Sequence, residues 1–132
     1  MLKQIILLAA SLLLLSGCGG KEAAAPSYRQ ITQQEAQEIM NTEKDYLLLD
    51  VRTREEYDSG HIPGAICIPN ETIGSGEIAA LPDKEQLILV YCRSGNRSKQ
   101  AAEKLAQLGY TNIVEFGGIN TWTGETVSGS EG

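Results

Sequence analysis

Short, mainly apolar runs recur along the chain and alternate with segments that carry helix signals. The runs cover residues 46–51, 65–68, 87–91 and 112–115. Apolar runs of this length, bounded by polar or turn-forming residues, predict strands that are buried on both faces. Because such strands need helices on both sides of the sheet, the alternation predicts a parallel sheet in an α/β fold.

Two helices are predicted from capping boxes, in which a threonine and the glutamate three residues later each bond the other's backbone N–H. The first box begins at Thr32, and its helix should run to about Met40. The second begins at Thr53, and its helix should end at Gly60. A third helix is predicted over 98–108, where apolar residues recur at helical spacing before a glycine.

These elements predict one three-layer domain over residues 28–124, with a central sheet of four to five strands and helices on both faces. Residues 77–81 are expected to form one or two helical turns, within a segment, 70–80, that fits a helix and a loop equally well. In open parallel sheets, ligands bind beyond the carboxyl ends of the strands. Arg52 and Cys92 lie at the ends of two predicted strands, so both are expected near the functional site.

The N-terminus lies outside this alternation. After Lys3 comes an uncharged run whose apolar part, 5–15, is too short to span a bilayer and is typical of a signal peptide. The run ends in LSGC, which resembles a bacterial lipobox. We therefore expect 1–17 to be removed, Cys18 to be acylated, and the exported protein to be held at a membrane of the cell envelope. An ordinary secretory signal with an unrelated cysteine is the alternative.

The predicted domain is preceded by a tether, 18–27, and followed by a flexible tail, 125–132, both rich in small and polar residues. The formal net charge is -6, and no basic stretch exceeds two residues. A nucleic-acid partner is therefore not expected, because binding to phosphates needs a concentrated positive surface.

The chain contains three cysteines and one histidine, with no C-x-x-C pair. These residues at these spacings do not make a zinc site, so no metal is expected. With Cys18 assigned to a lipid, Cys67 and Cys92 remain in a compartment that permits disulfides. A disulfide between them is not expected, because each cysteine is accounted for by its own segment: Cys67 lies within an apolar strand, and Cys92 stands at the end of the strand before the 92–98 loop.

The segment 92–98, CRSGNRS, carries the main chemical signal. Cys92 stands where a buried strand ends and a helix begins, with Gly95 in the turn and Arg93 and Arg97 nearby. Backbone N–H groups and the positive end of a helix favour a thiolate over a thiol and can hold an anion beside it. A thiolate at this place can act as the nucleophile of a covalent mechanism.

Three blocks in this order resemble the single-domain rhodanese family of sulfurtransferases: DVRTREEYDSGHIPGA at 50–65, CRSGNRS at 92–98, and a Gly-Gly pair followed by Trp122. The resemblance runs from about residue 30 to Trp122. It implies a rhodanese-like fold. It also implies that Cys92 takes sulfane sulfur from a donor such as thiosulfate, as a persulfide. The sulfur then passes to cyanide or another thiophilic acceptor, without a metal or organic cofactor.

The loop residues are expected to hold the small anionic donor: Arg93, Ser94, Gly95, Asn96, Arg97 and Ser98. Gly95 should allow a backbone angle closed to other residues. Arg97 either binds the donor or makes a surface ion pair. Ser98 either donates a hydrogen bond to the loop or sulfur, or caps the following helix.

Other polar residues are expected to support the site. Asp50 is interpreted as accepting loop N–H groups and Arg52 as forming a structural ion pair, because thiolate chemistry needs no separate general base; a catalytic pair is the alternative. His61 is interpreted as satisfying a turn by hydrogen bonding, with an acid–base group as the alternative. Cys67 is interpreted as a small apolar side chain, with a resolving thiol as the alternative. Trp122 is expected to cap the core.

Two other functions stay open. A phosphatase or arsenate reductase would use the same thiolate on an oxyanion, but phosphatase loops place one more residue between the cysteine and the arginine than separates Cys92 and Arg97. A sulfur carrier or docking module would pass its persulfide only to a protein partner. The lipid expected at Cys18 favours such a carrier, because a tether raises the local concentration near membrane partners.

Overall fold

The computed structural model describes residues 27–74 and 76–130 of the chain. The expected signal peptide, the acylated Cys18 and all but the last residue of the tether lie outside the described residues. Within the two described ranges, no helix is long and apolar enough to cross a membrane.

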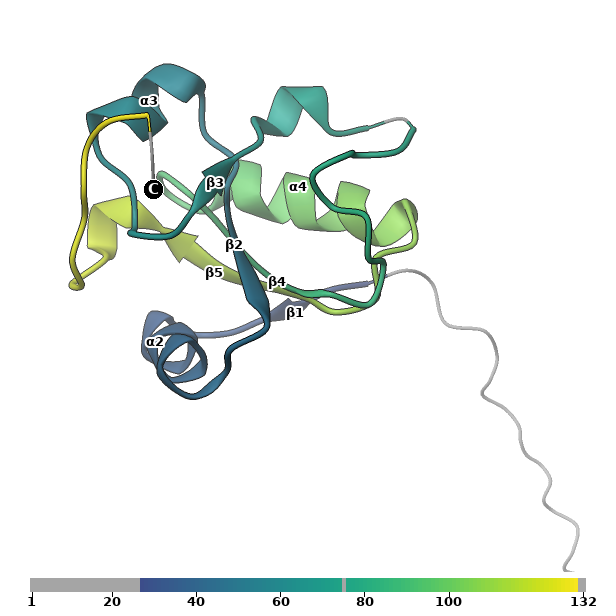
Figure 1. Cartoon of the computed structure of the whole chain (residues 1–132), viewed down its shortest axis with the longest axis horizontal. Coiled ribbons are helices and arrows are strands. Elements are labelled where there is room, and N and C mark those ends of the chain that lie inside the picture. Colours follow the sequence, from purple (N-terminus) through teal and green to yellow (C-terminus); the bar gives the residue numbers. More distant parts are fainter. Residues whose placement is uncertain (1–26, 75, 131–132) are drawn as a thin grey trace, which may run out of the picture.

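The central sheet has five strands, all parallel, in the order β1-β5-β4-β2-β3 (Figure 1). Its strands are β1 (Arg29–Gln30), β2 (Tyr46–Asp50), β3 (Ile66–Cys67), β4 (Leu87–Cys92) and β5 (Ile113–Gly118). The predicted α/β fold with a parallel sheet of four to five strands is confirmed. Edge strand β1 was not predicted, and β5 continues past the predicted end at residue 115 through Gly117 and Gly118.

Helices cover both faces of the sheet. They are α2 (Gln33–Thr42), α3 (Arg54–Ser59) and α4 (Asn96–Gln107), with 3-10 turns η3 (Asn70–Thr72) and η4 (Ile119–Thr121). Helices α2 and α4 lie on opposite sides of the sheet (Figure 1). Because successive strand residues point to opposite faces, Val90 and Cys92 pack on the α4 side, whereas Leu89 and Tyr91 pack on the α2 side.

Both predicted capping boxes form. Thr32 Oγ1 accepts a hydrogen bond from Glu35 N at 3.0 Å, and Thr32 N donates to Glu35 Oε1 at 2.9 Å. The corresponding distances for Thr53 and Glu56 are 3.2 Å and 3.0 Å. The two helices begin where the sequence predicted because all the atoms of each box lie within four consecutive residues.

Helix α4 begins earlier than predicted. Its first residue is Asn96, and Gly95 is the N-cap in the left-handed conformation, with φ 110°. The glycine turns the chain sharply out of β4 and starts the helix with no side-chain cap. Ser98 therefore lies inside the first turn, and the alternative that made it the helix cap was wrong. Its side chain is fully buried and faces the sheet.

Two other segments differ from expectation. Residues 77–81 form no helix, because a turn that is closed by Leu81 N and Ile78 O at 2.9 Å places Leu81 in the core on the α4 side. Part of the segment expected to be a flexible tail is bound to the domain: Val127 forms an antiparallel bridge with His61, with N···O distances of 2.7 Å and 2.8 Å.

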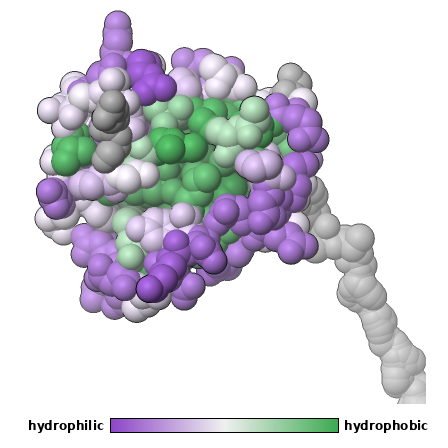
Figure 2. Space-filling view, in the orientation of Figure 1, coloured by the Kyte–Doolittle hydropathy of each residue, from purple (hydrophilic) through white to green (hydrophobic). Residues whose placement is uncertain are grey.

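Apolar side chains also gather on one part of the surface, over β2 and β3 (Figure 2). The residues in and next to β3, Ile66, Cys67 and Ile68, are half-buried. Polar and charged side chains surround this area (Figure 2). Strand β3 has only two residues, which limits its use as a template for pairing with another chain.

Candidate active site

Cys92 is the last residue of β4, so its thiol lies at the carboxyl end of the central strand. The side chain is buried, with 1% of the residue exposed. Gly95 N donates to Cys92 Sγ at 2.9 Å, and Sγ lies 3.4 Å from Ser98 Oγ. The left-handed turn at Gly95 therefore brings one backbone N–H and the first turn of α4 onto the sulfur, as anion binding at a helix start requires.

The predicted loop residues divide by exposure. Gly95 and Ser98 are buried beside the sulfur, whereas Arg93, Ser94 and Asn96 are exposed around it. No side-chain hydrogen bond ties the three exposed residues to the rest of the described chain. They surround the place where a donor would approach, and their contacts with a donor stay a prediction.

Arg97 points to helix α3. Its Nη1 and Nη2 donate to the two carboxylate oxygens of Glu56 at 2.8 Å and 3.0 Å. Such a bidentate pair is strong and geometrically specific. It lowers the pKa of Glu56 to about 2, with further help from the backbone N–H and hydroxyl of Thr53. The ion pair that was one alternative for Arg97 is present and holds α3 against α4.

Asp50 and Arg52 form a second, buried ion pair. Arg52 donates to both carboxylate oxygens of Asp50, with Nη2 at 2.7 Å, and also to Gly60 O at 2.6 Å. Tyr91 Oη donates a hydrogen bond to Asp50 at 2.7 Å. The pKa of Tyr91 is raised mainly by burial, and also by the negative charge of Asp50. Asp50 and Arg52 are thus occupied with each other, with Tyr91 and with the backbone, not with the Cys92 sulfur.

His61 is fully buried after helix α3. Its Nδ1 lies 2.8 Å from Tyr57 O, and its ring stacks on the Tyr57 ring with centroids 3.7 Å apart. Its backbone pairs with Val127. These contacts place His61 in the packing between α3 and the C-terminal segment.

Cys67 and Cys92 face opposite sides of the sheet. Cys67 pairs in register with Asp50, and its side chain packs against the α2-side core, whereas Cys92 belongs to the α4-side core. Both thiols are free, which agrees with the expected lack of a bridge between them. Burial raises the pKa of Cys67, so it carries less thiolate near neutral pH. A direct passage of sulfur between the two is not favoured by this arrangement.

Sequence reasoning missed Glu115, a carboxylate that is 2% exposed in strand β5. Its Oε2 lies 2.5 Å from Ser98 Oγ and accepts from Gly117 N at 3.0 Å. Gln30 Nε2 donates to Oε1 at 3.3 Å. The available signal was one acidic residue inside an otherwise apolar strand pattern, which is rare without a specific partner.

The end of β5 supports the loop from the other side. A Cβ atom added to Gly118 would collide with the backbone carbonyl of Arg93, so no side chain fits there. Asn120 N donates to the same carbonyl at 3.1 Å. The Gly-Gly pair therefore allows β5 to approach the loop closely enough to fix its path.

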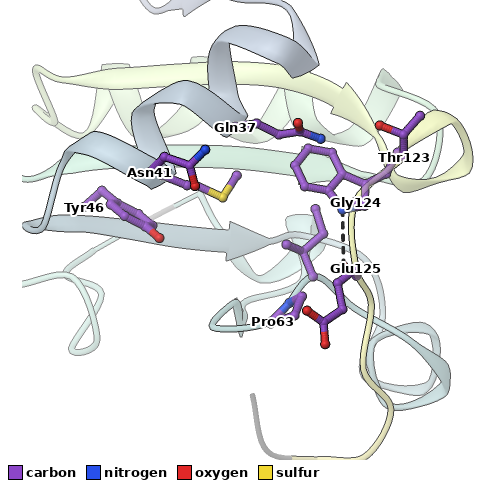
Figure 3. A pocket seen from close by; sticks show the side chains of 10 residues that line it. Gln37, Asn41, Tyr46, Pro63, Thr123, Gly124 and Glu125 are labelled. Carbon is purple, nitrogen blue, oxygen red and sulfur yellow. Dashed lines mark hydrogen bonds between the residues drawn. The ribbon is translucent and has the colours of Figure 1, made fainter.

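Trp122 lies away from the loop. Its ring packs on Phe116, with centroids 5.6 Å apart, which agrees with the predicted capping of the core. It also lines an open cavity of about 410 Å³ between α2 and the C-terminal segment (Figure 3). Gln37, Asn41 and Pro63 lie on other sides of this cavity, and no residue of the 92–98 loop lines it.

Together, the parallel sheet and a buried thiol at a strand-to-helix turn form an arrangement that suits nucleophilic catalysis by cysteine. Among the residues that the structure describes, no cluster of three or more His, Cys, Asp or Glu could hold a metal ion. The model of the Rhodanese-like domain family matches residues 32–125, and the chain belongs to this family.

The relatives include proteins named as sulfurtransferases and one named as a putative sulfur carrier protein, YrkF of Bacillus subtilis. The chain is 41% identical over 71 residues to thiosulfate sulfurtransferase PspE of Escherichia coli, covering 54% of this chain and 68% of that protein. It is 36% identical over 87 residues to the adenylyltransferase and sulfurtransferase uba4 of Ogataea parapolymorpha, covering 65% of this chain but only 22% of that relative. A solved structure described as a rhodanese with anions from E. coli aligns with a TM-score of 0.58 at 37% identity, covering 64% of this chain and 99% of the other. The chain is thus a homologue of sulfurtransferases.

The ion pair between α3 and α4 should show in the pH dependence of stability. Glu56→Gln removes the charge while a capping box can still form. Because the pKa of Glu56 falls from 4.5 unfolded to about 2 folded, its contribution is complete above pH 4.5 and is lost as the pH falls through about 2. The two side chains are 31% and 28% exposed, so we expect a loss of about 1–2 kcal/mol at neutral pH.

Urea unfolding between neutral and acid pH measures this difference. It should shrink steadily on acidification for Glu56→Gln, while Glu55→Gln, an exposed neighbour on the same helix, should match the wild type throughout. A difference that did not change with pH would assign the loss to the helix cap rather than to the ion pair.

Gly118→Ala should destabilise the domain by about 1–3 kcal/mol, because the added methyl meets the backbone of Arg93 and no side chain can move away. Gly60→Ala is the matched control, since its backbone is extended at φ 163° and a Cβ there would meet nothing within 4 Å. Thermal unfolding of both variants checks this. Equal stability of the two would contradict the close approach of β5 to the loop.

Proposed function

We propose that this protein is a rhodanese-type sulfurtransferase that carries sulfane sulfur as a persulfide on Cys92, with thiosulfate as the donor class and cyanide or a thiol as the acceptor class. The observation that carries the proposal is the 2.9 Å hydrogen bond from Gly95 N to Cys92 Sγ at the start of α4. A donor N–H and the positive helix end stabilise negative charge on sulfur. Kinship with PspE supports the choice of donor.

The reaction has two displacement steps. In the first, the Cys92 thiolate attacks the outer sulfur of thiosulfate, the S–S bond breaks, and sulfite leaves with the electron pair. In the second, the acceptor attacks the terminal sulfur of the persulfide, the new S–S bond breaks, and the thiolate returns. The same Gly95 N–H can hold negative sulfur before and after each step, which is how a covalent intermediate divides one difficult transfer into two.

Two features of the loop favour sulfur over a phosphate or arsenate substrate. The spacing from Cys92 to Arg97 is one residue shorter than in tyrosine phosphatases, so the loop makes a smaller cradle. The guanidinium that would hold a tetrahedral oxyanion is instead engaged with both carboxylate oxygens of Glu56. The persulfide adds one sulfur atom to Cys92, whereas the covalent intermediate of a phosphatase would place a phosphoryl group with three free oxygens in the same loop.

The N-terminal sequence adds a location to this proposal. We propose that Cys18 is acylated after removal of 1–17 and that the domain acts at a membrane of the cell envelope, where a protein acceptor is a second candidate for the sulfur. The exposed Arg93, Ser94 and Asn96 around the buried thiol leave room for such an acceptor to approach. Tethering raises the local concentration of that partner.

Cys92→Ser should abolish sulfur transfer from thiosulfate to cyanide, by at least about 1000-fold, because a hydroxyl neither ionises near neutral pH nor forms a persulfide. The fold should be kept, since the substitution is nearly isosteric. Cys67→Ser is the control and should retain turnover, because Cys67 faces the other side of the sheet. Mass spectrometry after thiosulfate treatment should find one added sulfur on Cys92. Substantial turnover by Cys92→Ser would reject the mechanism.

Acylation of Cys18 is tested by growing cells with a radiolabelled fatty acid. The wild-type protein should carry the label and sediment with membranes, and Cys18→Ser should do neither, because a lipobox cysteine is the only acceptor expected in this chain. Cys67→Ser should behave as the wild type. An unlabelled wild-type protein would contradict the lipid anchor and leave the proposed chemistry at Cys92 unaffected.

A further inference from the structure

We propose that Glu115, acting through the hydroxyl of Ser98, receives the proton of the Cys92 thiol when the sulfur becomes a nucleophile. This inference rests on the proposed function and adds a path for the thiol proton, so it replaces the expectation that this chemistry needs no separate general base. Glu115 does not touch the sulfur, so it is a positioning residue that acts through Ser98. We call Cys92, Ser98 and Glu115 together the proton relay.

The relay joins three elements of the fold. Cys92 ends β4, Ser98 lies in the first turn of α4, and Glu115 lies in β5. Cys92 Sγ is 3.4 Å from Ser98 Oγ, and Ser98 Oγ is 2.5 Å from Glu115 Oε2. The three residues are 1%, 0% and 2% exposed. A thiol buried this deeply has little direct access to water, so an internal group that accepts its proton has a clear use.

The direction of the hydrogen bonds follows from the single hydrogen of a hydroxyl. Ser98 Oγ has three acceptors in reach: Glu115 Oε2 at 2.5 Å, Gly95 O at 3.0 Å and Gly117 O at 3.4 Å. The carboxylate is both the nearest and the strongest, because hydrogen bonds to charged oxygens are short and about twice as strong as neutral ones. Because the hydroxyl hydrogen of Ser98 is donated to Glu115, Ser98 Oγ can act only as an acceptor in its contact with Cys92. The Cys92 thiol is then the donor of that hydrogen bond.

The proton step then balances without any other reactant. The S–H bond of Cys92 breaks as an O–H bond forms at Ser98 Oγ. The original Ser98 hydrogen passes to Glu115 Oε2, and the electron pair stays on sulfur, which attacks the outer sulfur of thiosulfate. Afterwards the new Ser98 O–H points to the sulfur and can donate to it. When Cys92 is released from the persulfide, the same two transfers in reverse can restore the thiol.

The surroundings hold Glu115 in place for this role. Gly117 N and Gln30 Nε2 both donate to its carboxylate. Two other ionisable groups lie near the relay, Tyr28 and Arg97. The pKa of Tyr28 is raised mainly by burial, and also by the negative charges of Glu115 and Glu103. The guanidinium of Arg97 is bonded to Glu56. Neither makes a hydrogen bond to Ser98 or to the sulfur, so the proton path runs to Glu115.

Single-turnover formation of the Cys92 persulfide from thiosulfate, measured between about pH 6 and pH 8, tests the relay. The wild type should be nearly independent of pH, within about twofold, because the proton stays inside the protein. Glu115→Gln and Ser98→Ala should each be about 100-fold slower at neutral pH and should speed up about tenfold per pH unit, because the thiol must then ionise to solvent. Glu103→Gln, an exposed carboxylate on α4, should match the wild type.

Two further variants test whether the effect depends on the contact between Glu115 and Ser98, on the charge of Glu115 alone, or on misfolding. Glu115→Asp keeps the charge but is one methylene too short to reach Ser98, so it should show the same pH slope as Glu115→Gln. The double variant Ser98→Ala with Glu115→Gln should be no slower than either single variant, because both act on one path. Circular dichroism and thermal unfolding confirm that each variant is folded.

The outcomes distinguish the relay from the function on which it rests. A pH-independent rate in a folded Glu115→Gln or Glu115→Asp variant, or fully additive losses in the double variant, would overturn the relay while leaving persulfide chemistry intact. Absence of the persulfide in the wild type would instead overturn the proposed function. Should Glu115→Gln fail to fold, Ser98→Ala decides alone, since a flat pH profile in that variant equally excludes a path through its hydroxyl.

Discussion

The turn at Gly95 is the constraint on which the site depends. Its left-handed backbone, at φ 110°, lets the chain leave β4 at Cys92 and enter α4 at Asn96, so that the first turn of the helix lies beside the Cys92 sulfur. The same residue supplies the N–H that reaches Sγ at 2.9 Å. A side chain at this position would be strained, because L residues rarely adopt this left-handed φ. One glycine thus fixes both the direction of the helix and the donor on the sulfur.

The parallel sheet gives this turn its neighbours. Strands β2, β4 and β5 end at the same edge, so the Asp50–Arg52 pair, Cys92 and the Gly-Gly pair come together although they are far apart in sequence. The two faces then serve different purposes. On the α2 side, Tyr91 and the ion pair of Asp50 and Arg52 fix the strand ends. On the α4 side, the buried Cys92 sulfur lies beside Ser98. The ion pair between Glu56 and Arg97 holds α3 against α4.

Structural features that depend on a few adjacent residues were predicted from the sequence. Contacts between residues far apart in the sequence were not. The capping boxes at Thr32 and Thr53 and the strand-end position of Cys92 depend on a few adjacent residues, and they were predicted correctly. The partner of Arg97 is 41 residues away and that of Ser98 is 17 residues away, so no local pattern reveals either contact. The start of α4 was missed for another reason: a left-handed glycine replaced the side-chain cap that the serine seemed to offer.

Asp50 and Glu115 show why one buried carboxylate calls for a functional account and the other does not. A buried charge is costly unless it is paired and hydrogen-bonded. Asp50 has a cation, Arg52, in bidentate contact, so its presence follows from structure alone. Within the described part of the chain, the hydrogen bonds of Glu115 come from neutral donors: Gln30, Ser98 and the backbone at Gly117. A glutamine could fill the same space and accept some of the same bonds at a lower desolvation cost, but it could not take a proton. Under the proposed relay, what distinguishes a glutamate from a glutamine at this position is acid–base chemistry, directed by Ser98 toward the sulfur.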